Sequence, residues 1–275
     1  MRESGTFSRL PERMANKIAA LGVLALALWG CGGGGSGDEQ QGGATTGPPP
    51  TTADISLLFM GNSHTSFHNL TGMVADMIRA GRPGKTVASV EAPGWMFLDE
   101  RVNDVQSLSL LRGQRWSFVT LQAQKYSTSG QLTYSTAEAE QLIGMARQSG
   151  AVPIMFPEWP RRDVAEPQRI YDLHVSIAQR QTACVAPIGQ AWDLALARHP
   201  NLTLHASDGN HSAPAGAFLA ALVLYATMTG SSPLELPAFS QYPVDSDTQS
   251  LLRAIADETV RMVPPRFWCP MDPFA

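Results

Sequence analysis

The chain has 275 residues and a formal net charge of −4, with 44% of its residues hydrophobic and 16% charged. This balance is typical of an ordinary globular protein. It offers no basic surface for nucleic acid, so we expect no nucleic-acid partner.

The N-terminus has the pattern of an export signal. Positively charged side chains precede an apolar run from Ile18 to Trp29, which is shorter than the about 20 residues that span a bilayer. The run ends in the string LWGC at Cys31 and resembles a bacterial lipobox, although Trp29 is bulkier than usual. The resemblance implies removal of residues 1–30 and lipid modification of Cys31, with a plain secretory signal as the alternative.

A linker follows the predicted lipid site. After Cys31 the sequence reads GGGGSGDEQQGGATTGPPPTT, which has no apolar periodicity and is typical of a flexible tether. We therefore divide the chain into a signal peptide (1–30), a lipidated Cys with its linker (31–53) and one folded domain (54–275). The expected location is the bacterial cell envelope, with the lipid anchor as the contact with a membrane.

Strands and helices alternate in the predicted domain. Short apolar runs typical of buried parallel strands lie at 55–60, 86–90, 118–121, 152–156 and 183–188. Helices are predicted at 69–80, 97–112, 137–147, 166–181, 190–198, 213–229 and 248–262. This alternation predicts an α/β domain, with a parallel sheet covered on both faces and a ligand at the carboxyl ends of the strands.

Two cysteines remain if Cys31 is lipidated. Cys184 and Cys269 can form a disulfide in an exported protein. The alternative is that Cys184, inside the apolar string ACVAPIG, is a buried free thiol. The sequence supplies no distance between the two residues and leaves both alternatives open.

A serine follows the first predicted strand directly. Gly61-Asn62-Ser63 stands where a sharp strand-to-helix turn exposes a nucleophile at the edge of the sheet. Gly61 permits the tight turn, and backbone N–H groups near the helix start can help to hold an oxyanion. Taken alone, the pattern also fits an ordinary N-cap serine.

An acid and a base stand together far along the chain. Asp208-Gly209-Asn210-His211 lies in a predicted loop before the helix at 213–229. The carboxylate of Asp208 can hold one imidazole nitrogen of His211 protonated, which leaves the other nitrogen to accept a proton from Ser63. An Asx turn with an incidental histidine is the alternative for this loop alone.

The two motifs in this order resemble the end blocks of the SGNH/GDSL hydrolase family. The string DGNHSAPAGAFLAALVLYATMTG is similar to a bacterial subgroup whose first block reads GNS. The resemblance implies a flavodoxin-like three-layer sandwich with five parallel strands. It also implies Ser63 as nucleophile, His211 as base and Asp208 as the acid that orients it.

The middle blocks of the family are less well matched. Family members usually carry Asp at the position of Asn62. Gly94 matches the oxyanion glycine by position, although a turn fits equally well. The Asn of the third block is absent, and Gln122 is our first choice to replace its amide, with Gln124 second. The expected oxyanion hole is therefore the backbone N–H of Ser63, that of Gly94 and the Gln122 amide.

Other polar residues have weaker patterns. His64 and His68 stand four apart but lack further ligands nearby, so we expect no metal site. Glu158 and Trp159 follow the fourth strand, where they either shape the pocket or pack the loop.

These patterns predict an enzyme that cleaves ester bonds through an acyl-enzyme and needs no cofactor. We expect a short acyl group on a small-molecule or carbohydrate ester, by analogy with the family, and a monomer. Two alternatives stay open, an acyltransferase and a non-catalytic surface lipoprotein on the same fold.

Overall fold

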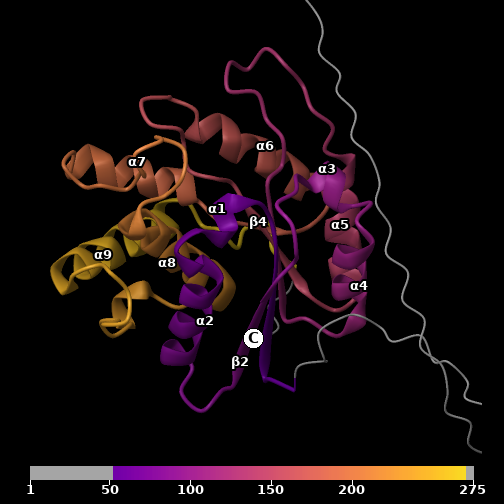
Figure 1. The fold of residues 1–275 in the computed structure, drawn as a ribbon, viewed down its shortest axis with the longest axis horizontal. Coiled ribbons are helices and arrows are strands. Elements are labelled where there is room, and N and C mark those ends of the chain that lie inside the picture. Colours follow the sequence, from indigo (N-terminus) through magenta and orange to yellow (C-terminus); the bar gives the residue numbers. More distant parts are fainter. Residues whose placement is uncertain (1–51, 271–275) are drawn as a thin grey trace, which may run out of the picture. The chain divides into compact units, whose positions relative to one another are not determined.

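The sheet is entirely parallel. The computed structural model describes residues 52–270, so the predicted signal peptide, Cys31 and the linker up to residue 51 lie outside the described residues. The strand order is β2-β1-β3-β4-β5, with β1 (Ile55–Met60), β2 (Val87–Glu91), β3 (Phe118–Gln122), β4 (Val152–Phe156) and β5 (Cys184–Val185). This confirms the predicted α/β sandwich around five parallel strands (Figure 1).

Helices connect the strands and follow the last one. They are α1 (Ser63–Ser66), α2 (Leu70–Gly81), α3 (Leu98–Arg101), α4 (Val105–Gly113), α5 (Ala137–Gln148), α6 (Pro167–Arg180), α7 (Ile188–Arg198), α8 (Pro214–Thr229) and α9 (Ser246–Met262). Two short 3-10 turns, Phe67–Asn69 and Pro233–Glu235, complete the described elements.

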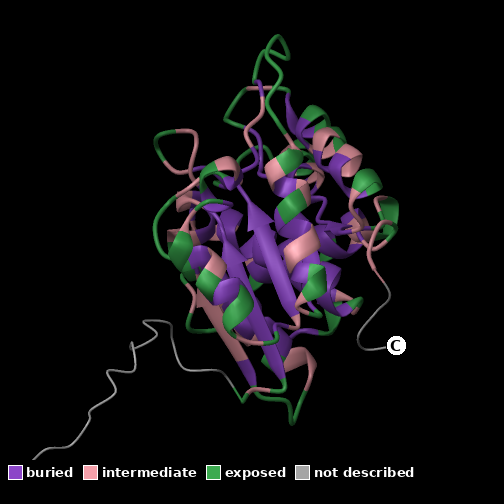
Figure 2. Ribbon diagram, turned by 90° about the vertical axis from the view of Figure 1, so that its right-hand side faces the viewer, coloured by how far each residue is buried: buried purple, intermediate pink, exposed green. Residues whose placement is uncertain are grey.

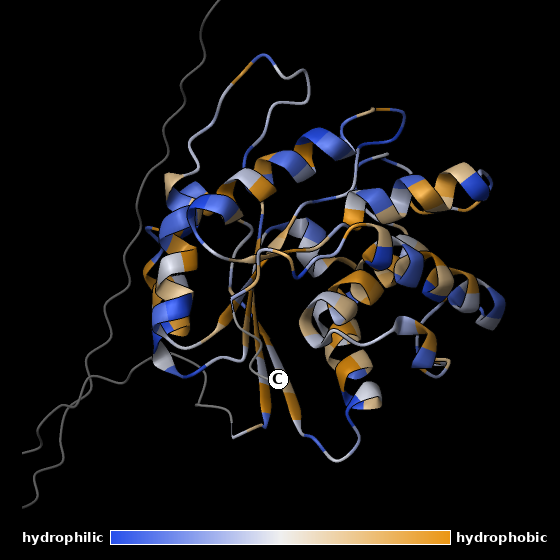
Figure 3. Ribbon diagram, turned by 180° about the vertical axis from the view of Figure 1, so that it is seen from behind, coloured by the Kyte–Doolittle hydropathy of each residue, from blue (hydrophilic) through white to orange (hydrophobic). Residues whose placement is uncertain are grey.

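The core lies on both faces of the sheet because strand side chains alternate between them. Leu57 and Phe59 of β1 pack in one cluster with α2, α7 and α8. Leu58 and Met60 face the opposite way and pack with α4, α5 and α6. Figure 1 shows α2, α8 and α9 on one side of the sheet and α4 and α5 on the other. Apart from β2, of which only Val87 is buried, the strands are accordingly buried and apolar along most of their length (Figures 2 and 3).

Helix α8 is the most buried helix of the fold. Every residue from Gly216 to Thr229 is buried, because α8 packs against α2, α7 and α9. A helix covered on all sides is expected to be apolar all round rather than amphipathic. Among residues 52–270, no helix has both the length and the apolar character needed to cross a membrane.

Three local predictions need correction. The helix predicted at 97–112 is two helices, because the Asp104 side chain accepts the Ser107 N–H at 2.8 Å and starts α4 as its N-cap. The fifth strand is shorter than predicted, since the chain enters α7 at Ile188. Finally, α1 begins at Ser63 itself, before the helix predicted at 69–80.

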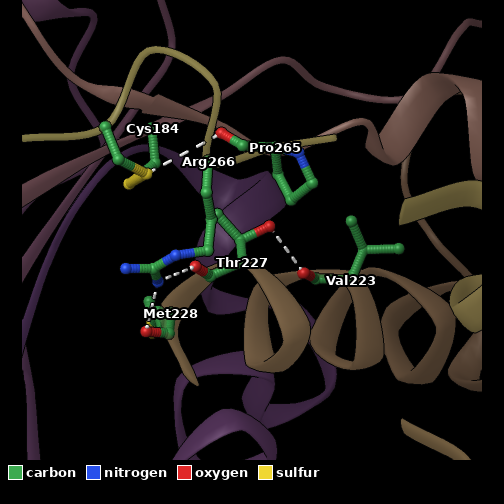
Figure 4. The surroundings of a disulfide bond; sticks show 7 residues. Cys184, Val223, Thr227, Met228, Pro265 and Arg266 are labelled. Carbon is green, nitrogen blue, oxygen red and sulfur yellow. Dashed lines mark hydrogen bonds between the residues drawn. A yellow bond between two sulfur atoms is a disulfide. The ribbon is translucent and has the colours of Figure 1, made fainter. Parts of the chain in front are cut away.

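Cys184 and Cys269 form a disulfide, so the free-thiol alternative is wrong. The C-terminal segment that carries Cys269 is also held by Arg266, whose guanidinium donates to the carbonyls of Thr227 and Met228 at 2.9 and 3.0 Å (Figure 4). The segment therefore joins the last strand to the carboxyl end of α8.

The same segment covers the edge of the sheet. Val185 of β5 donates its backbone N–H to the carbonyl of Pro265 at 3.0 Å. An edge strand presents unpaired backbone groups that favour association with other chains. The C-terminal segment thus satisfies one of these groups next to the disulfide.

We predict that Cys269→Ala lowers the free energy of unfolding by about 2 to 5 kcal/mol, because the disulfide restrains a long loop in the unfolded chain. Cys184 keeps its buried packing in this variant. Urea denaturation measures the change. A reductant should lower the midpoint of the parent and leave that of the variant unchanged; equal stability of the two proteins would contradict the prediction.

Candidate active site

The serine turn is built directly on the end of β1. Asn62 is the N-cap of α1, and its side-chain oxygen accepts the His64 N–H at 3.0 Å. A Cβ atom at Gly61 would fall on the side chains of Thr65 and Gln122, so only glycine fits there. This turn holds Ser63, half-buried, at the carboxyl edge of the sheet.

Gln122, the last residue of β3, holds this turn through hydrogen bonds to its backbone and side chains. Its amide oxygen accepts the Asn62 N–H at 2.7 Å and the Thr65 hydroxyl at 2.8 Å. Its amide nitrogen donates to Glu158 at 3.1 Å. Because Gln122 is completely buried, both ends of its amide are used inside the protein.

Arg101 connects the serine turn to the Gly94 loop. Its guanidinium donates to the carbonyl oxygens of Gly61 at 2.6 Å and Gly94 at 2.7 Å, and to the Ser107 hydroxyl at 2.7 Å. Arg101 is completely buried, which lowers its pKa, but an arginine keeps its charge in proteins. The Ser107 hydroxyl in turn donates to Asp104 at 2.6 Å, so the buried cation is linked to a carboxylate through one hydroxyl.

The loop before α8 carries the acid and the base. Asp208 accepts the backbone N–H groups of Asn210 at 2.9 Å and His211 at 3.0 Å with one carboxylate oxygen. Trp159 donates its indole N–H to the Asn210 carbonyl at 2.9 Å and stacks on Trp192 with ring centroids 4.9 Å apart. The loop is thus held by hydrogen bonds of its own Asp208 and by the hydrogen bond from Trp159.

The structure brings Ser63, His211 and Asp208 together in one hydrogen-bonded chain. Nδ1 of His211 lies 2.6 Å from the second oxygen of Asp208, and Nε2 lies 2.8 Å from the Ser63 hydroxyl. The hydrogen bonds from His211 and Asn210 lower the pKa of Asp208 far below its usual value. An ionised Asp208 favours a proton on Nδ1, so Nε2 is the acceptor for the Ser63 hydroxyl.

Aromatic side chains hold the ring of His211 in place. Phe67 stacks on it with centroids 4.2 Å apart and an interplanar angle of 19°. The ring of His64 lies 5.2 Å from that of His211 and 4.9 Å from that of Trp159, centroid to centroid. This packing restricts rotation of the His211 ring and preserves its contact with Ser63.

Ser63 and His211 line a pocket of about 460 Å³. Polar and aromatic side chains make up the remaining wall, namely Asn62, His64, Phe97, Lys125, Tyr126, Thr128, Tyr134, Glu158, Arg161 and Asn210. Lys125 is paired with Asp99 at 2.6 Å. A ligand of small to moderate size can therefore reach the Ser63 hydroxyl.

Glu158 and His64 form the buried side of this pocket. Burial raises the pKa of Glu158 to about 7, against a hydrogen bond from Gln122 that lowers it. Burial also lowers the pKa of His64 to about 4, with the nearby His211 as the next cause. His64 is therefore neutral at pH 7, and its 3.6 Å approach to Glu158 is not an ion pair at that pH.

Gly94, Gln122 and Gln124, which the sequence offers for the oxyanion hole, have different surroundings in the structure. The Gly94 carbonyl is held by Arg101, and the glycine has a φ of +73°. Gln122 donates to Glu158, and Gln124 donates to the carbonyls of Lys125 and Ser135, both at 2.9 Å. Both glutamines are buried and their amide nitrogens already donate inside the protein, so the expectation that one of them donates to an oxyanion needs correction.

The two histidines of the weak metal pattern separate. His64 lines the pocket, whereas His68 donates to the backbone carbonyl of Ser212 at 2.9 Å. Within the part of the chain that the structure describes, no group of three or more His, Cys, Asp or Glu side chains is arranged to hold a metal ion. Of the two roles considered for Glu158 and Trp159, Glu158 has the first and lines the pocket, and Trp159 has the second and packs against the loop.

Sequence reasoning missed Arg101, Tyr126, Lys125 and Arg161. None of them belongs to a motif, and the first is 40 residues from the carbonyl of Gly61 that it binds. An Arg in the middle of a helical pattern reads as a solvent-exposed residue. Only the packing of the loops around the sheet reveals their positions.

Solved structures with this arrangement of strands and helices include a protein from Slackia heliotrinireducens that is named as a candidate SGNH hydrolase. It is 26% identical, with a TM-score of 0.53, and the match covers 63% of this chain and 98% of that one. A DUF4886 family protein from Bacteroides uniformis has a TM-score of 0.59 at 15% identity, over 77% of this chain and 96% of that one. The second likeness shows the fold, and the first supports hydrolase activity in general. No protein-family model and no curated protein sequence matches the chain.

We predict that Glu158→Gln makes the stability less dependent on pH. The usual pKa of Glu158 is 4.5 and its folded value is about 7. The folded state therefore binds the proton more tightly, so the stability that this proton contributes is full below pH 4.5 and is lost as pH rises through 7.

Between pH 5 and 8 the parent should lose about 2 to 3 kcal/mol relative to Glu158→Gln. Glutamine keeps the shape of Glu158 and its acceptor for Gln122. Urea denaturation of both proteins at each pH gives the difference, in which the other titrating groups cancel. A difference that stays constant with pH would mean that Glu158 titrates as an ordinary carboxyl.

Proposed function

We propose that the chain is a serine hydrolase of the SGNH/GDSL type that cleaves ester bonds through an acyl-enzyme. The observation that carries this proposal is the continuous chain from Asp208 through His211 to Ser63 at the wall of an accessible pocket, with distances of 2.6 and 2.8 Å. A nucleophile, a base and a residue that orients the base are the parts this chemistry requires.

The geometry fits a two-step acyl transfer. Ser63 Oγ attacks the ester carbonyl while Nε2 of His211 takes the hydroxyl proton, and Asp208 stabilises the resulting imidazolium. His211 then gives this proton to the leaving alcohol as the carbon–oxygen bond breaks. Water, deprotonated by His211, releases the acid and restores the Ser63 hydroxyl.

Two backbone donors are proposed for the oxyanion, the N–H groups of Ser63 and Gly94. Arg101 supports both, because it binds the carbonyls of Gly61 and Gly94 and so fixes the two loops relative to each other. Preorganised donors of this kind make a large contribution to catalysis because they need no reorganisation during the reaction.

The substrate class follows from the pocket and from family analogy. Short-chain acyl esters, including acetyl groups on a carbohydrate, are the proposed substrates. The half-exposed rings of Phe97 and Tyr134 at the pocket wall suit contact with a sugar ring. The same residues could pass the acyl group to an alcohol instead of water, which is the acyltransferase alternative.

We further propose export and anchoring through a lipid on Cys31, as the N-terminal sequence predicts. The disulfide between Cys184 and Cys269 supports the export part of this proposal, because structural disulfides persist mainly in oxidising compartments outside the cytosol.

The proposed nucleophile makes Ser63→Ala the decisive variant. Hydrolysis of 4-nitrophenyl acetate by the full chain should fall by about four to six orders of magnitude, since a missing nucleophile leaves only the oxyanion donors and binding. A fluorophosphonate label should modify the parent and spare the variant. Ser129→Ala, in an exposed loop, is the matched control and should behave like the parent.

Equal activity of the parent and Ser63→Ala would assign hydrolysis to another residue. Absence of both hydrolysis and labelling in the parent would favour the non-catalytic alternative over the enzyme.

Arg101→Lys should lower kcat by about 10- to 100-fold with little change in KM, because small displacements of reacting groups carry losses of this size. A lysine cannot bind the Gly61 and Gly94 carbonyls as a rigid fork. Steady-state kinetics on the same ester test the split between kcat and KM. Arg147→Lys, at an exposed position of α5, is the control. A loss confined to thermal stability would reduce Arg101 to a purely structural residue.

A further inference from the structure

The charges around the pocket are unequally compensated. Lys125 and Arg161 are the cations of its wall and Glu158 is the anion. Lys125 donates to Asp99 at 2.6 Å, so its charge is balanced outside the pocket. The guanidinium of Arg161 forms no ion pair with a carboxylate among residues 52–270, unlike Lys125, the other cation of the pocket wall.

The backbone of Arg161 is nevertheless fixed. Its N–H donates to the buried carboxylate of Glu166 at 3.0 Å. The N–H of the next residue, Arg162, donates to the carbonyl of Gly209 at 2.8 Å. Arg161 therefore stands on a loop that is hydrogen-bonded to the loop of Asp208 and His211, so its position relative to the reacting serine is set by the fold.

The charge of Arg161 acts on the interior of the pocket. Burial is the main cause of the pKa shifts of Tyr126, Glu158 and His64, and the positive charge of Arg161 contributes to all three. These groups come from different segments and line the same cavity. The guanidinium is thus close to the space that a substrate would occupy.

Glu158 interacts with the charge of Arg161 but forms no ion pair with it. Its carboxylate accepts the Gln122 amide at 3.1 Å on the buried side of the pocket, and no ion pair joins it to Arg161 in the described structure. The same pocket wall also carries uncharged hydrogen-bond donors, the hydroxyls of Thr128 and Tyr134, whereas the Tyr126 hydroxyl donates to Glu166 at 3.5 Å. A guanidinium carried on a fixed backbone, with neutral donors in the same pocket wall, is suited to bind a planar anion.

We infer that the pocket takes an ester that carries a carboxylate, and that Arg161 is the residue that selects it. The inference rests on the proposed esterase function and names its substrate class. A cation without an ion-pair partner matches a group with a single negative charge, and a guanidinium can bind both oxygens of a carboxylate at once. The carboxylate lies on either the acyl or the alcohol side of the scissile bond.

Two pairs of esters distinguish these sides. The first pair compares mono-4-nitrophenyl succinate, whose acyl group carries a carboxylate, with the neutral 4-nitrophenyl pentanoate. The second pair compares acetoxybenzoate, whose leaving group carries the carboxylate, with its neutral methyl ester. For this pair the release of acetate is measured. The measured quantity is the ratio of kcat/KM for the charged to the neutral member, in the full chain and in Arg161→Gln. Because it is a ratio, a general loss of activity cancels.

For one of the pairs the parent ratio should exceed that of Arg161→Gln by about 10- to 100-fold, the range of a charge-assisted hydrogen bond. Arg161→Lys should give an intermediate ratio, and Arg147→Gln the parent ratio. Salt should lower the ratio only where Arg161 is present.

Ratios that Arg161→Gln leaves unchanged in both pairs would overturn the inference and leave the esterase proposal intact. Failure of the parent on all four esters, neutral ones included, would overturn both.

Discussion

A single buried amide organises the edge of the sheet on which the candidate site stands. Gln122 ends β3, binds the Asn62 N–H and the Thr65 hydroxyl beyond β1, and donates to Glu158 beyond β4. Three neighbouring strands are thereby joined where their carboxyl ends meet. Since a buried amide with an unsatisfied end would cost about 1 to 3 kcal/mol, the loops that supply its partners are held to these positions.

Arg101 and Glu158 are buried ionisable groups near this edge of the sheet, and they have different effects. Arg101 stays charged, and its desolvation is offset by the carbonyls that it binds rather than by a directly contacting carboxylate. Glu158 can instead take up a proton, because burial raises its pKa to about 7. The serine turn is thus held by one group with constant charge and supported by another whose charge changes near neutral pH.

The sequence predicts the strands well because buried parallel strands are short apolar runs, and 55–60 and 152–156 match β1 and β4 to the residue. The break between α3 and α4 escaped prediction, since it depends on one local hydrogen bond to Asp104. The motif residues Ser63, Asp208 and His211 were named from spacing and family resemblance, and they do lie together. The orientation of Gln122 was not predictable, because its partner Asn62 is 60 residues away and either end of an amide fits a motif.

The disulfide divides the candidate site between two topological parts of the chain. Asp208 and His211 lie inside the covalent loop closed by Cys184 and Cys269, whereas Ser63 lies outside it. A protease that cuts one peptide bond within this loop would leave both pieces covalently joined. The segment that carries the base would then remain tethered to β5, while the same cut between Ser63 and Cys184 would separate the chain into two molecules held only by packing.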